Sequence, residues 1–566
     1  MAQKAAQAVI LRRDQLAEEH RMWVPHWQEL ADYIQPRKSN IAFQRSPAQQ
    51  QTDLMFDSTA PHALELLGAS MQGALTSSAF KWFGYRIRGV ELARDSELTK
   101  LLTECDRDSA DALNMSNWES ESHEAYLDLP CFGTTAILIE EVPPQIGRPP
   151  GQLRFTTLRP GEYMVDEDAE GRVNALFRTF RLSARAAVQQ FGPGLGENVY
   201  KTALQNPAQR FEFIHAIYPR EDATLLMKGR LRLPASKKPI ASVWVNVADQ
   251  VVMRTSGYDE WPVPAPRWTK SSGEMYGRGP GTVALPHIKT LNKAVELKLK
   301  MWAKKVDPPV IARDEGVAGQ MQLWNNGITY VRDMEAIKVL DLSGDIQGAD
   351  MEEEKMRAEI RRMFFSDQLQ LQEGPQMTAY EVQVRYELMQ RVLGPTMGRV
   401  KVELLDPTLE RVFWVRLRAS DRNSPYLRVE QWCRANNVPL DIEYEGPLAK
   451  AQRLQDSIAM QRFWQIVLPL SQVDPKVLDK VDMDKMMDIH AESVGVPPQI
   501  MRSPEATEEI RAARRQAQEE QAQQEQMVQA AGAAKDVAPL LSAISSTGGG
   551  TGIIPPGAGS PAITSG

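Results

Sequence analysis

The stretch from Tyr276 to Asp314 constrains the fold most, because it predicts one long helix between a Gly/Pro-rich turn and a Pro-Pro stop. Glycines and Pro280 punctuate its start, and Pro286 is tolerated only in a first turn. The Asp-Pro-Pro sequence at 307–309 forbids continuation. About 20 residues between these signals would span on the order of 30 Å.

This helix carries two stripes of side chains at helical spacing, one apolar and one basic. The apolar stripe consists of Ile288, Leu291, Val295, Leu299 and Trp302, and the basic stripe consists of Lys289, Lys293, Lys300 and Lys304. By periodicity alone this is an ordinary amphipathic helix with solvated lysines, in which Glu296 pairs with Lys300. Two stripes nevertheless imply two different neighbours.

Length and composition predict a globular protein of several regions. The 566 residues exceed the size at which one hydrophobic core keeps growing. Hydrophobic residues at 42% and charged residues at 25% are typical of soluble proteins. No apolar run approaches the roughly 20 residues that a membrane-spanning helix needs, and residues 1–20 lack a secretory signal. We therefore expect no membrane span and synthesis in the cytoplasm.

Charge and cysteine usage exclude several classes of site. The three cysteines, Cys105, Cys131 and Cys433, are odd in number and far apart, which argues against a disulfide framework and a cysteine-based zinc site. A net charge of −7 argues against tight, static binding of the DNA backbone, which requires a basic surface. A DNA conduit remains compatible with this charge, because a ring repeats every lysine in each subunit.

The first half of the chain is predicted to change from helices to strands. We expect a helix over residues 3–35 that Pro25 divides and Pro36 ends, and another from residue 58, capped by Ser58 or Thr59. Grouped aromatics at 75–87 are typical of a core, and one helix follows over about 91–127. From Cys131 alternating apolar residues predict strands, with a short helix at 183–191 that Gly192 ends and an extended connector through Pro262, Pro264 and Pro266.

The second half is predicted to be mostly helical. A small unit over 310–347 contains the hairpin signal Asn326-Gly327, and a helix returns over about 349–371. After a break at 370–377, Thr378 and Glu381 form a capping box. The helix that follows runs to about Arg418 with kinks at Gly394-Pro395 and Pro407.

Two short motifs could bind ligands, but each has a simpler interpretation. The glycines at 277–281 could hold a phosphate at a helix N-terminus, although they lack the lysine of a P-loop and favour a turn. Asp166, Glu167 and Asp168 could bind magnesium, although adjacent acids are typical of a solvated turn. We therefore predict no catalytic residue, no metal and no cofactor.

Three segments carry a resemblance to a known family. They are YGRGPG followed by ALPHIKTLNKAVELKLKMWAKKVDPP, the N-terminal pattern DSTAP to FKWF, and TAYEVQVR to LGP. Over about residues 5–500 the chain resembles the portal (head-to-tail connecting) proteins of short-tailed (podovirus, T7-like) bacteriophages. The resemblance implies a predominantly helical α+β fold that assembles as a ring. Its implied regions are 1–275 (wing), 276–305 (first stem helix), 306–347 (clip), 348–371 (second stem helix), 372–378 (tunnel loop), 379–440 (long kinked wing helix), 441–530 (helical crown) and 531–566 (flexible tail).

The resemblance also implies a function that is structural rather than enzymatic. A ring, dodecameric in this family, would sit at the capsid vertex of the virion after assembly in the host cytoplasm, and double-stranded DNA would enter and leave through it. Implied partners are the terminase large subunit, a tail adaptor protein, and the major capsid and scaffold proteins. DNA-channel candidates are Lys289, Lys293, Lys300 and Lys304 on the stem, and Gln372, Glu373, Gln376 and Met377 in the tunnel loop.

Two alternatives stay open at this point. One is an internal or scaffold virion protein without a channel, and the other is a magnesium-dependent nucleic-acid enzyme that uses Asp166 and Asp168. Sequence alone does not decide which stripe of the long helix faces the lumen.

Overall fold

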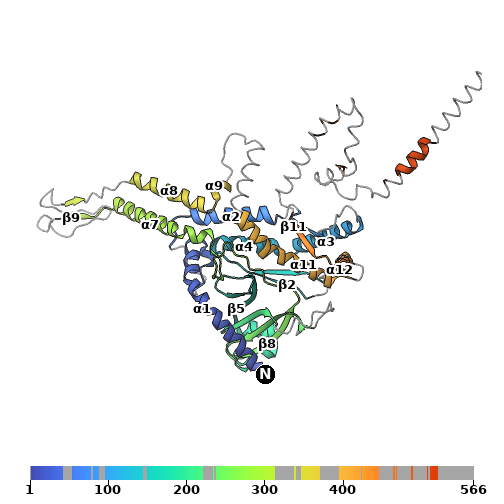
Figure 1. Ribbon diagram of the computed structural model, residues 1–566. Coiled ribbons are helices and arrows are strands. Elements are labelled where there is room, and N and C mark those ends of the chain that lie inside the picture. The colour runs from blue at the N-terminus through green and yellow to red at the C-terminus, as the bar shows by residue number, and fades with distance from the viewer. Residues whose placement is uncertain are drawn as a thin grey trace, which may run out of the picture. The chain divides into compact units, whose positions relative to one another are not determined.

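The computed structural model describes residues 2–42, 54–77, 81–87, 96–143, 150–220, 234, 237–312, 337–339, 346–369, 394–421, 424–444, 463, 465, 467, 469, 486, 487, 507 and 510–519. The chain divides into two compact units, Met1–Ala451 and Gln452–Gly566, and the first holds nearly all described residues (Figure 1). Within these ranges no helix has both the length and the apolar character needed to cross a bilayer.

The N-terminal helix α1 (Ala2–Ile34) is continuous, so the expected division at Pro25 is wrong. A proline inside a helix costs about 3 kcal/mol, because it removes a backbone hydrogen bond. Both halves of α1 are held by packing, since Ala6 is buried against a sheet while Trp27 and Leu30 are buried in the main core. That burial offsets the cost. As predicted, the helix ends before Pro36, which opens the short 3-10 helix η1 (Pro36–Lys38).

The next helices differ from the prediction in one boundary. Helix α2 (Thr59–Leu75) begins where expected, but the carboxylate of Asp57, rather than Ser58 or Thr59, accepts the backbone N–H of Thr59 at 2.9 Å. The single helix expected over 91–127 is wrong, because α3 (Ser96–Asn114) and α4 (Trp118–Phe132) are separate.

Asn117 is the physical reason for that break. Its side-chain amide donates to the carbonyl of Phe155 at 2.8 Å and accepts the N–H of the same residue at 2.9 Å. Asparagine favours such bonds over a helix interior. Phe155 lies in β3 (Leu153–Thr157), which pairs with β2 (Ile137–Glu141).

A five-stranded antiparallel sheet follows in chain order, which confirms the predicted strand region. Its strands are β4 (Tyr163–Glu167), β5 (Val173–Ser183), β6 (Arg210–Pro219), β7 (Ile240–Asn246) and β8 (Val251–Tyr258). One face packs on the N-terminal half of α1. The other packs on α5 (Ala184–Phe191), η3 (Gly192–Leu195) and α6 (Glu197–Gln205). As expected, α5 ends at Gly192, whose φ is 67°.

The proline-rich connector after β8 lies along β2. The carbonyls of Pro262, Pro264 and Pro266 accept backbone N–H groups from Ile139, Ile137 and Thr135 at 2.8, 3.0 and 3.2 Å. Proline has no N–H but keeps its carbonyl, so these residues complete a sheet edge as acceptors only. The extended conformation predicted for this connector is confirmed.

The stretch 379–440 was expected as one long kinked helix. In its described residues the helical run ends at Ala419, and a separate helix begins at Pro425. Residues 394–400 are helical, the π-helix η7 (Lys401–Leu405) follows, and α11 (Asp406–Ala419) ends near the expected position. Beyond it lie α12 (Pro425–Asn436) and β11 (Leu440–Tyr444). The hydroxyl of Ser424 caps α12, while β11 pairs with β1 (Phe83–Ile87). The aromatics Trp82, Phe83 and Tyr85 are buried there, as predicted.

Two long helices, α7 (Pro280–Val306) and α8 (Ile346–Met363), run side by side (Figure 1). Pro286 lies inside α7 beyond the first turn, so the expectation that it must open the helix is wrong. Ala284 and Ile288, on either side of it, are fully or almost fully buried, and their packing holds the helix through the proline. Helix α8 ends before the expected position, because Phe365 takes a positive φ of 58°, and α9 (Ser366–Leu369) follows.

The short strands β9 (Val310–Ala312) and β10 (Ile337–Val339) pair between these two helices in the chain. The Asn326-Gly327 turn, the capping box at Thr378, the tunnel-loop stretch 372–378 and most of 441–566 lie outside the described residues.

Candidate functional site

The glycines at the start of α7 pack directly against the backbone at the end of α4. A Cβ atom on Gly279 would lie 2.2 Å from the carbonyl oxygen of Pro130, and one on Gly281 would lie 2.6 Å from that of Cys131. A Cβ on Gly277 would lie 2.5 Å from the carbonyl oxygen of Gly133. Only glycine fits such contacts. The motif therefore serves close packing of two backbone segments, as the turn interpretation expects.

Aromatic side chains pack the segment just before α7 against α1. Tyr276 meets Trp27 edge-on, with ring centroids 5.0 Å apart, and His20 packs edge-on against Trp27 at 5.3 Å. Burial lowers the pKa of His20 to about 4, so its ring is neutral at pH 7. The guanidinium of Arg278 lies 4.9 Å from the ring centroid of Trp23. These contacts fix where α7 leaves the core.

A buried arginine, Arg267, lies just before α7 and bonds to two segments that are distant from it in the sequence. Arg267 is 1% exposed, and its guanidinium donates to Glu403 at 2.9 Å, to Glu167, and to the carbonyl of Gly171 at 2.9 Å. Its backbone N–H also donates to Glu403 at 2.8 Å. Glu403 lies in the π-helix η7 and Glu167 in β4. No local spacing in the sequence marks this cluster, because Gly171, Glu167 and Glu403 lie 96, 100 and 136 residues from Arg267.

The three adjacent acids at 166–168 have separate structural partners. Asp166 pairs with Arg12 at 3.0 Å, and Glu167 pairs with Arg267 and Lys270. Asp168 accepts the backbone N–H groups of Glu170 and Arg172 at 2.9 and 2.8 Å, which makes a local turn. Among the described residues no group of three or more His, Cys, Asp or Glu side chains is placed to hold a metal ion. These acids stabilise the fold, which weakens the enzyme interpretation.

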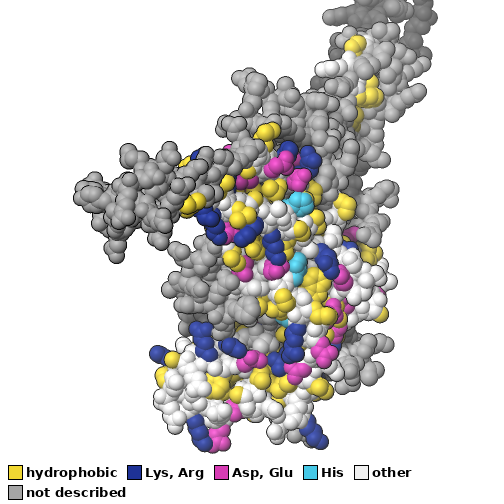
Figure 2. Space-filling model, turned by 90° about the vertical axis from the view of Figure 1, so that its left-hand side faces the viewer, with side chains coloured by type: hydrophobic (Ala, Val, Ile, Leu, Met, Phe, Trp, Pro, Cys, Tyr) yellow, Lys and Arg dark blue, Asp and Glu magenta, His cyan; other side chains and the backbone are white. Residues whose placement is uncertain are grey.

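The apolar stripe of α7 is buried in its first half and exposed in its second. Ile288, Leu291 and Val295 belong to the main core, as predicted. Leu299 and Trp302 continue the same stripe but are 49% and 60% exposed. Figure 2 shows hydrophobic side chains interspersed with Lys and Arg on the side of the molecule where α7 and α8 lie in Figure 1. The second half of α7 therefore exposes the apolar stripe that the first half buries.

The four candidate lysines share one edge of α7 but differ in their surroundings. Lys289 pairs with Glu29 of α1 at 2.7 Å. Lys300 and Lys293 both bond Glu296 and lower the pKa of that carboxyl, which confirms the expected pairing of Glu296 with Lys300. Lys304 is exposed near the end of the helix. The edge from Lys293 onward is thus a solvent-facing basic surface, and Lys289 is tied to α1. The other candidates, Gln372, Glu373, Gln376 and Met377, lie outside the described residues.

Helix α8 covers the side of α7 opposite these lysines. Lys298 donates to Asp350 at 2.9 Å and to the buried Glu353, and the bonds to Glu353 and Asp350 raise the pKa of Lys298. Arg357 links Glu353 to Asp57 before α2, with 2.9 Å from Arg357 Nε to the Asp57 carboxylate. At about 100° per residue, Lys298 lies roughly opposite Lys289 and Lys300 around α7. These bonds fix α7 relative to α8, and the four candidate lysines lie on the side of α7 away from α8.

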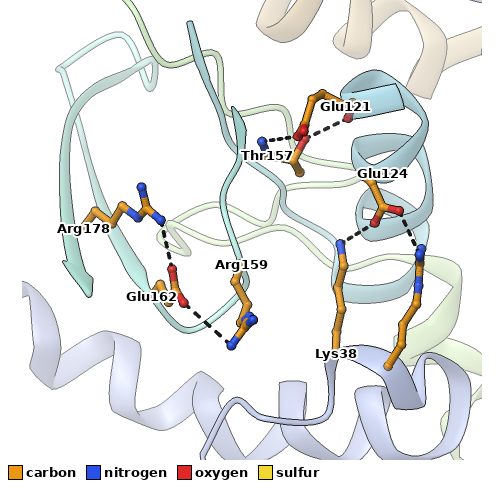
Figure 3. A pocket seen from close by; sticks show the side chains of 8 residues that line it. Lys38, Glu121, Glu124, Thr157, Arg159, Glu162 and Arg178 are labelled. Atoms are coloured by element: carbon orange, nitrogen blue, oxygen red, sulfur yellow. Dashed lines mark hydrogen bonds and ion pairs between the residues drawn. The ribbon is translucent and has the colours of Figure 1, made fainter. Parts of the chain in front are cut away.

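A polar pocket of about 370 Å³ is lined by paired charges (Figure 3). Glu124 lies between Arg37 and Lys38, at 2.8 and 3.0 Å. On another wall Glu162 lies between Arg159 and Arg178, at 3.8 and 3.4 Å. The lining holds four cations and three carboxylates, and each of these cations already faces a carboxylate. The pocket therefore offers no unpaired charge that would select a ligand.

Comparisons with known proteins extend over most of the chain. The family model described as bacteriophage head to tail connecting protein matches residues 6–501. A probable portal protein of Bordetella phage BPP-1 is 29% identical over 522 residues, which cover 88% of this chain and 90% of that protein. The portal protein of Salmonella phage epsilon15 is 25% identical over 541 residues, which cover 91% and 92%.

Among solved structures, a chain from the virion of a native gene transfer agent (GTA) particle matches with a TM-score of 0.30 and 13% identity. The match covers 77% of this chain and 94% of that one. At that TM-score the likeness supports no conclusion about the fold.

Proposed function

The chain belongs to the bacteriophage head to tail connecting proteins, and we propose that it is the portal subunit of a phage particle. Copies form a ring at the capsid vertex, through which double-stranded DNA is packaged and later ejected. The observation that carries this proposal is the family match over residues 6–501. Two relatives named portal proteins, which align over about nine tenths of the chain, support it.

A structural role suits the chemistry of the described residues better than catalysis does. The acids proposed for a magnesium site, Asp166 and Asp168, are engaged with Arg12 and with a local turn. Packaging therefore draws its energy from a separate ATPase, the terminase large subunit. That subunit docks on the ring first, and a tail adaptor protein replaces it.

The proposed regions follow the order of the chain. Residues 1–275 form the wing, α7 and α8 form the stem, 306–347 form the clip that docks the terminase, and 372–378 form the tunnel loop. The stretch 379–440 returns to the wing, 441–530 form the crown, and 531–566 form a flexible tail. The ring is a dodecamer that contacts the major capsid and scaffold proteins, and it assembles in the host cytoplasm.

We assign the lysine edge of α7 to the DNA channel, together with the tunnel-loop residues Gln372, Glu373, Gln376 and Met377. Lys293, Lys300 and Lys304 face solvent on the side away from α8, and Lys289 lies at the end of this edge nearest α1. Pairing with Glu296 reduces the net charge of the edge. Such a surface attracts phosphates weakly in each copy and lets DNA slide, while the ring repeats the contact in every subunit.

Changing Lys293, Lys300 and Lys304 together to glutamine is expected to leave rings intact and to lower the fraction of DNA-filled heads several-fold. The loss of phosphate contacts removes attraction that the ring repeats in every subunit, and the salt dependence of DNA retention should become shallower. The measurement is the ratio of filled to empty particles after complementation of a portal-deficient phage. Lys201→Gln, at an exposed lysine on α6, is the matched control. Normal filling by the triple variant would remove the role assigned to this edge.

A further inference from the structure

The region from the start of β5 to the end of β8, residues 173–258, is basic although the chain as a whole is acidic. It holds 12 Lys and Arg residues against 5 Asp and Glu residues, whereas the whole chain has a net charge of −7. Charge of one sign does not specify a fold, but it attracts partners of the opposite sign. The excess therefore points to a surface in this region that meets an anionic partner.

Three exposed arginines meet at one corner of the five-stranded sheet, where β5 ends and β6 begins. Arg181 lies near the end of β5, Arg185 lies in the first turn of α5, and Arg210 begins β6. Ser183 of β5 pairs with Arg210, and the backbone N–H of Arg185 donates to the carbonyl of Pro207 at 3.2 Å. These backbone bonds bring the three arginines together, and we call them the arginine corner.

The charge of the arginine corner is only partly neutralised. Arg13 and Arg181 share one carboxylate, that of Glu212, at 3.2 and 3.9 Å. Arg185 and Arg210 form no ion pair with any residue that the structure describes. Arg185 also lies at the positive end of the α5 dipole, where a cation is unfavourable. Like charges that are held together against local preference are typical of functional surfaces.

Two large apolar side chains are exposed beside these arginines. Tyr200 and Leu204 lie four residues apart on one side of α6, and they are 43% and 78% exposed. Helix α6 packs against α5, and the turn that follows α6 supplies the carbonyl that bonds Arg185. Lys201, also on α6, pairs with Glu197 at 2.6 Å and adds no net charge. The arginine corner is thus bordered by an apolar strip.

This combination favours an acidic segment of a protein over DNA as the partner. Tight binding of duplex DNA uses about 6 to 10 phosphate contacts, which three arginines do not supply. The phosphate backbone also offers nothing apolar to Tyr200 and Leu204. Guanidinium groups bind carboxylates through two parallel hydrogen bonds, and arginine clusters recognise acidic motifs in proteins. Arginine and tyrosine are also enriched at protein interfaces.

Resting on the proposed function, we propose that the arginine corner docks an acidic segment of another protein of the phage particle. Carboxylates of that segment bind Arg181, Arg185 and Arg210, and an apolar side chain of the segment packs against Tyr200 and Leu204. Because the arginines are exposed, the contact weakens as the salt concentration rises. Neither the lysine edge of α7 nor α8 takes part in it.

The test places a photo-crosslinking residue, p-benzoylphenylalanine, at position 200 of the full chain. It replaces one aromatic side chain by another and leaves Leu204 and the arginines in place. The chain is supplied to a portal-deficient phage, assembled particles are irradiated, and the crosslinked segment is sequenced by mass spectrometry. The same chain with Arg185→Gln and Arg210→Gln tests the charge. The matched control carries Lys100→Gln and Arg107→Gln, which remove two exposed cations from α3.

The expected adduct joins position 200 to a segment of a different protein that has more carboxylates than cations and also carries apolar residues. Its yield should fall about tenfold or more in the Arg185 and Arg210 variant, because two charge-assisted contacts are lost. The α3 control should keep the full yield. Circular dichroism of each purified variant should match that of the unmodified chain, since all four substituted residues are exposed.

Several results would overturn the docking assignment while leaving the portal function standing. They are particles that contain the chain but give no adduct, an adduct with another copy of this chain, an adduct that nuclease removes, a crosslinked segment without an excess of carboxylates, and an unchanged yield in the Arg185 and Arg210 variant. Absence of the unmodified chain from assembled particles is a different result, and it would contradict the proposed function itself.

Discussion

Gly279→Ala is expected to prevent the chain from reaching its native fold, with a loss above about 4 kcal/mol. The new Cβ would lie 2.2 Å from the carbonyl oxygen and 2.8 Å from the carbonyl carbon of Pro130. These are backbone atoms at the end of α4, so no side-chain rotation can relieve the clash. The two helices would have to separate, and with them the aromatic contacts of Tyr276 that anchor α7. The measurement is soluble yield and thermal midpoint.

Gly73→Ala is the control for that change. A Cβ at this position in α2 would meet no atom within 4 Å, so the substitution should be neutral or stabilise by up to about 1 kcal/mol. A soluble Gly279→Ala protein with an unchanged thermal midpoint would show that α4 and α7 do not pack as described.

The second large effect is expected for Arg267→Ala, with a loss of about 3–5 kcal/mol. Removing the guanidinium leaves the carboxylate of Glu403 without its bonds at 2.9 and 3.3 Å and leaves the carbonyl of Gly171 without its donor. Chemical unfolding followed by fluorescence measures the change. Arg172→Ala is the control, because that side chain is 78% exposed and its pair with Glu170 should contribute less than about 1 kcal/mol.

A double variant separates the charge effect from lost packing. Arg267→Met with Glu403→Met removes both partners and should be less destabilising than Arg267→Ala, because no carboxylate of this pair is left unpaired. If Arg267→Ala instead unfolds with the same free energy as Arg172→Ala, the cluster does not stabilise the junction before α7.

Local signals in the sequence predict local elements well. Ser183 and Gly192 mark α5, alternation marks the strands, and the connector prolines mark an extended segment. Two of the errors arise where packing overrides a local rule. Pro25 and Pro286 both lie inside helices, because buried residues on either side hold the helix through them.

Distant pairing accounts for the elements that the sequence analysis did not predict. Strand β11 exists because it pairs with β1, and Arg86 and Glu443, 357 residues apart, bond across that pair. Arg267 and Glu403 likewise have no common motif. In contrast, the lysine edge of α7 follows from helical spacing alone, and the structure adds its orientation relative to α8.

The central claim is that copies of this chain form a ring with a channel, and electron microscopy of the purified protein together with its solution mass tests it most directly. The account predicts rings with a central hole and a mass that is a whole multiple of the chain mass, twelvefold for a dodecamer. A compact monomer at every concentration, or an assembly without a central hole, would contradict it.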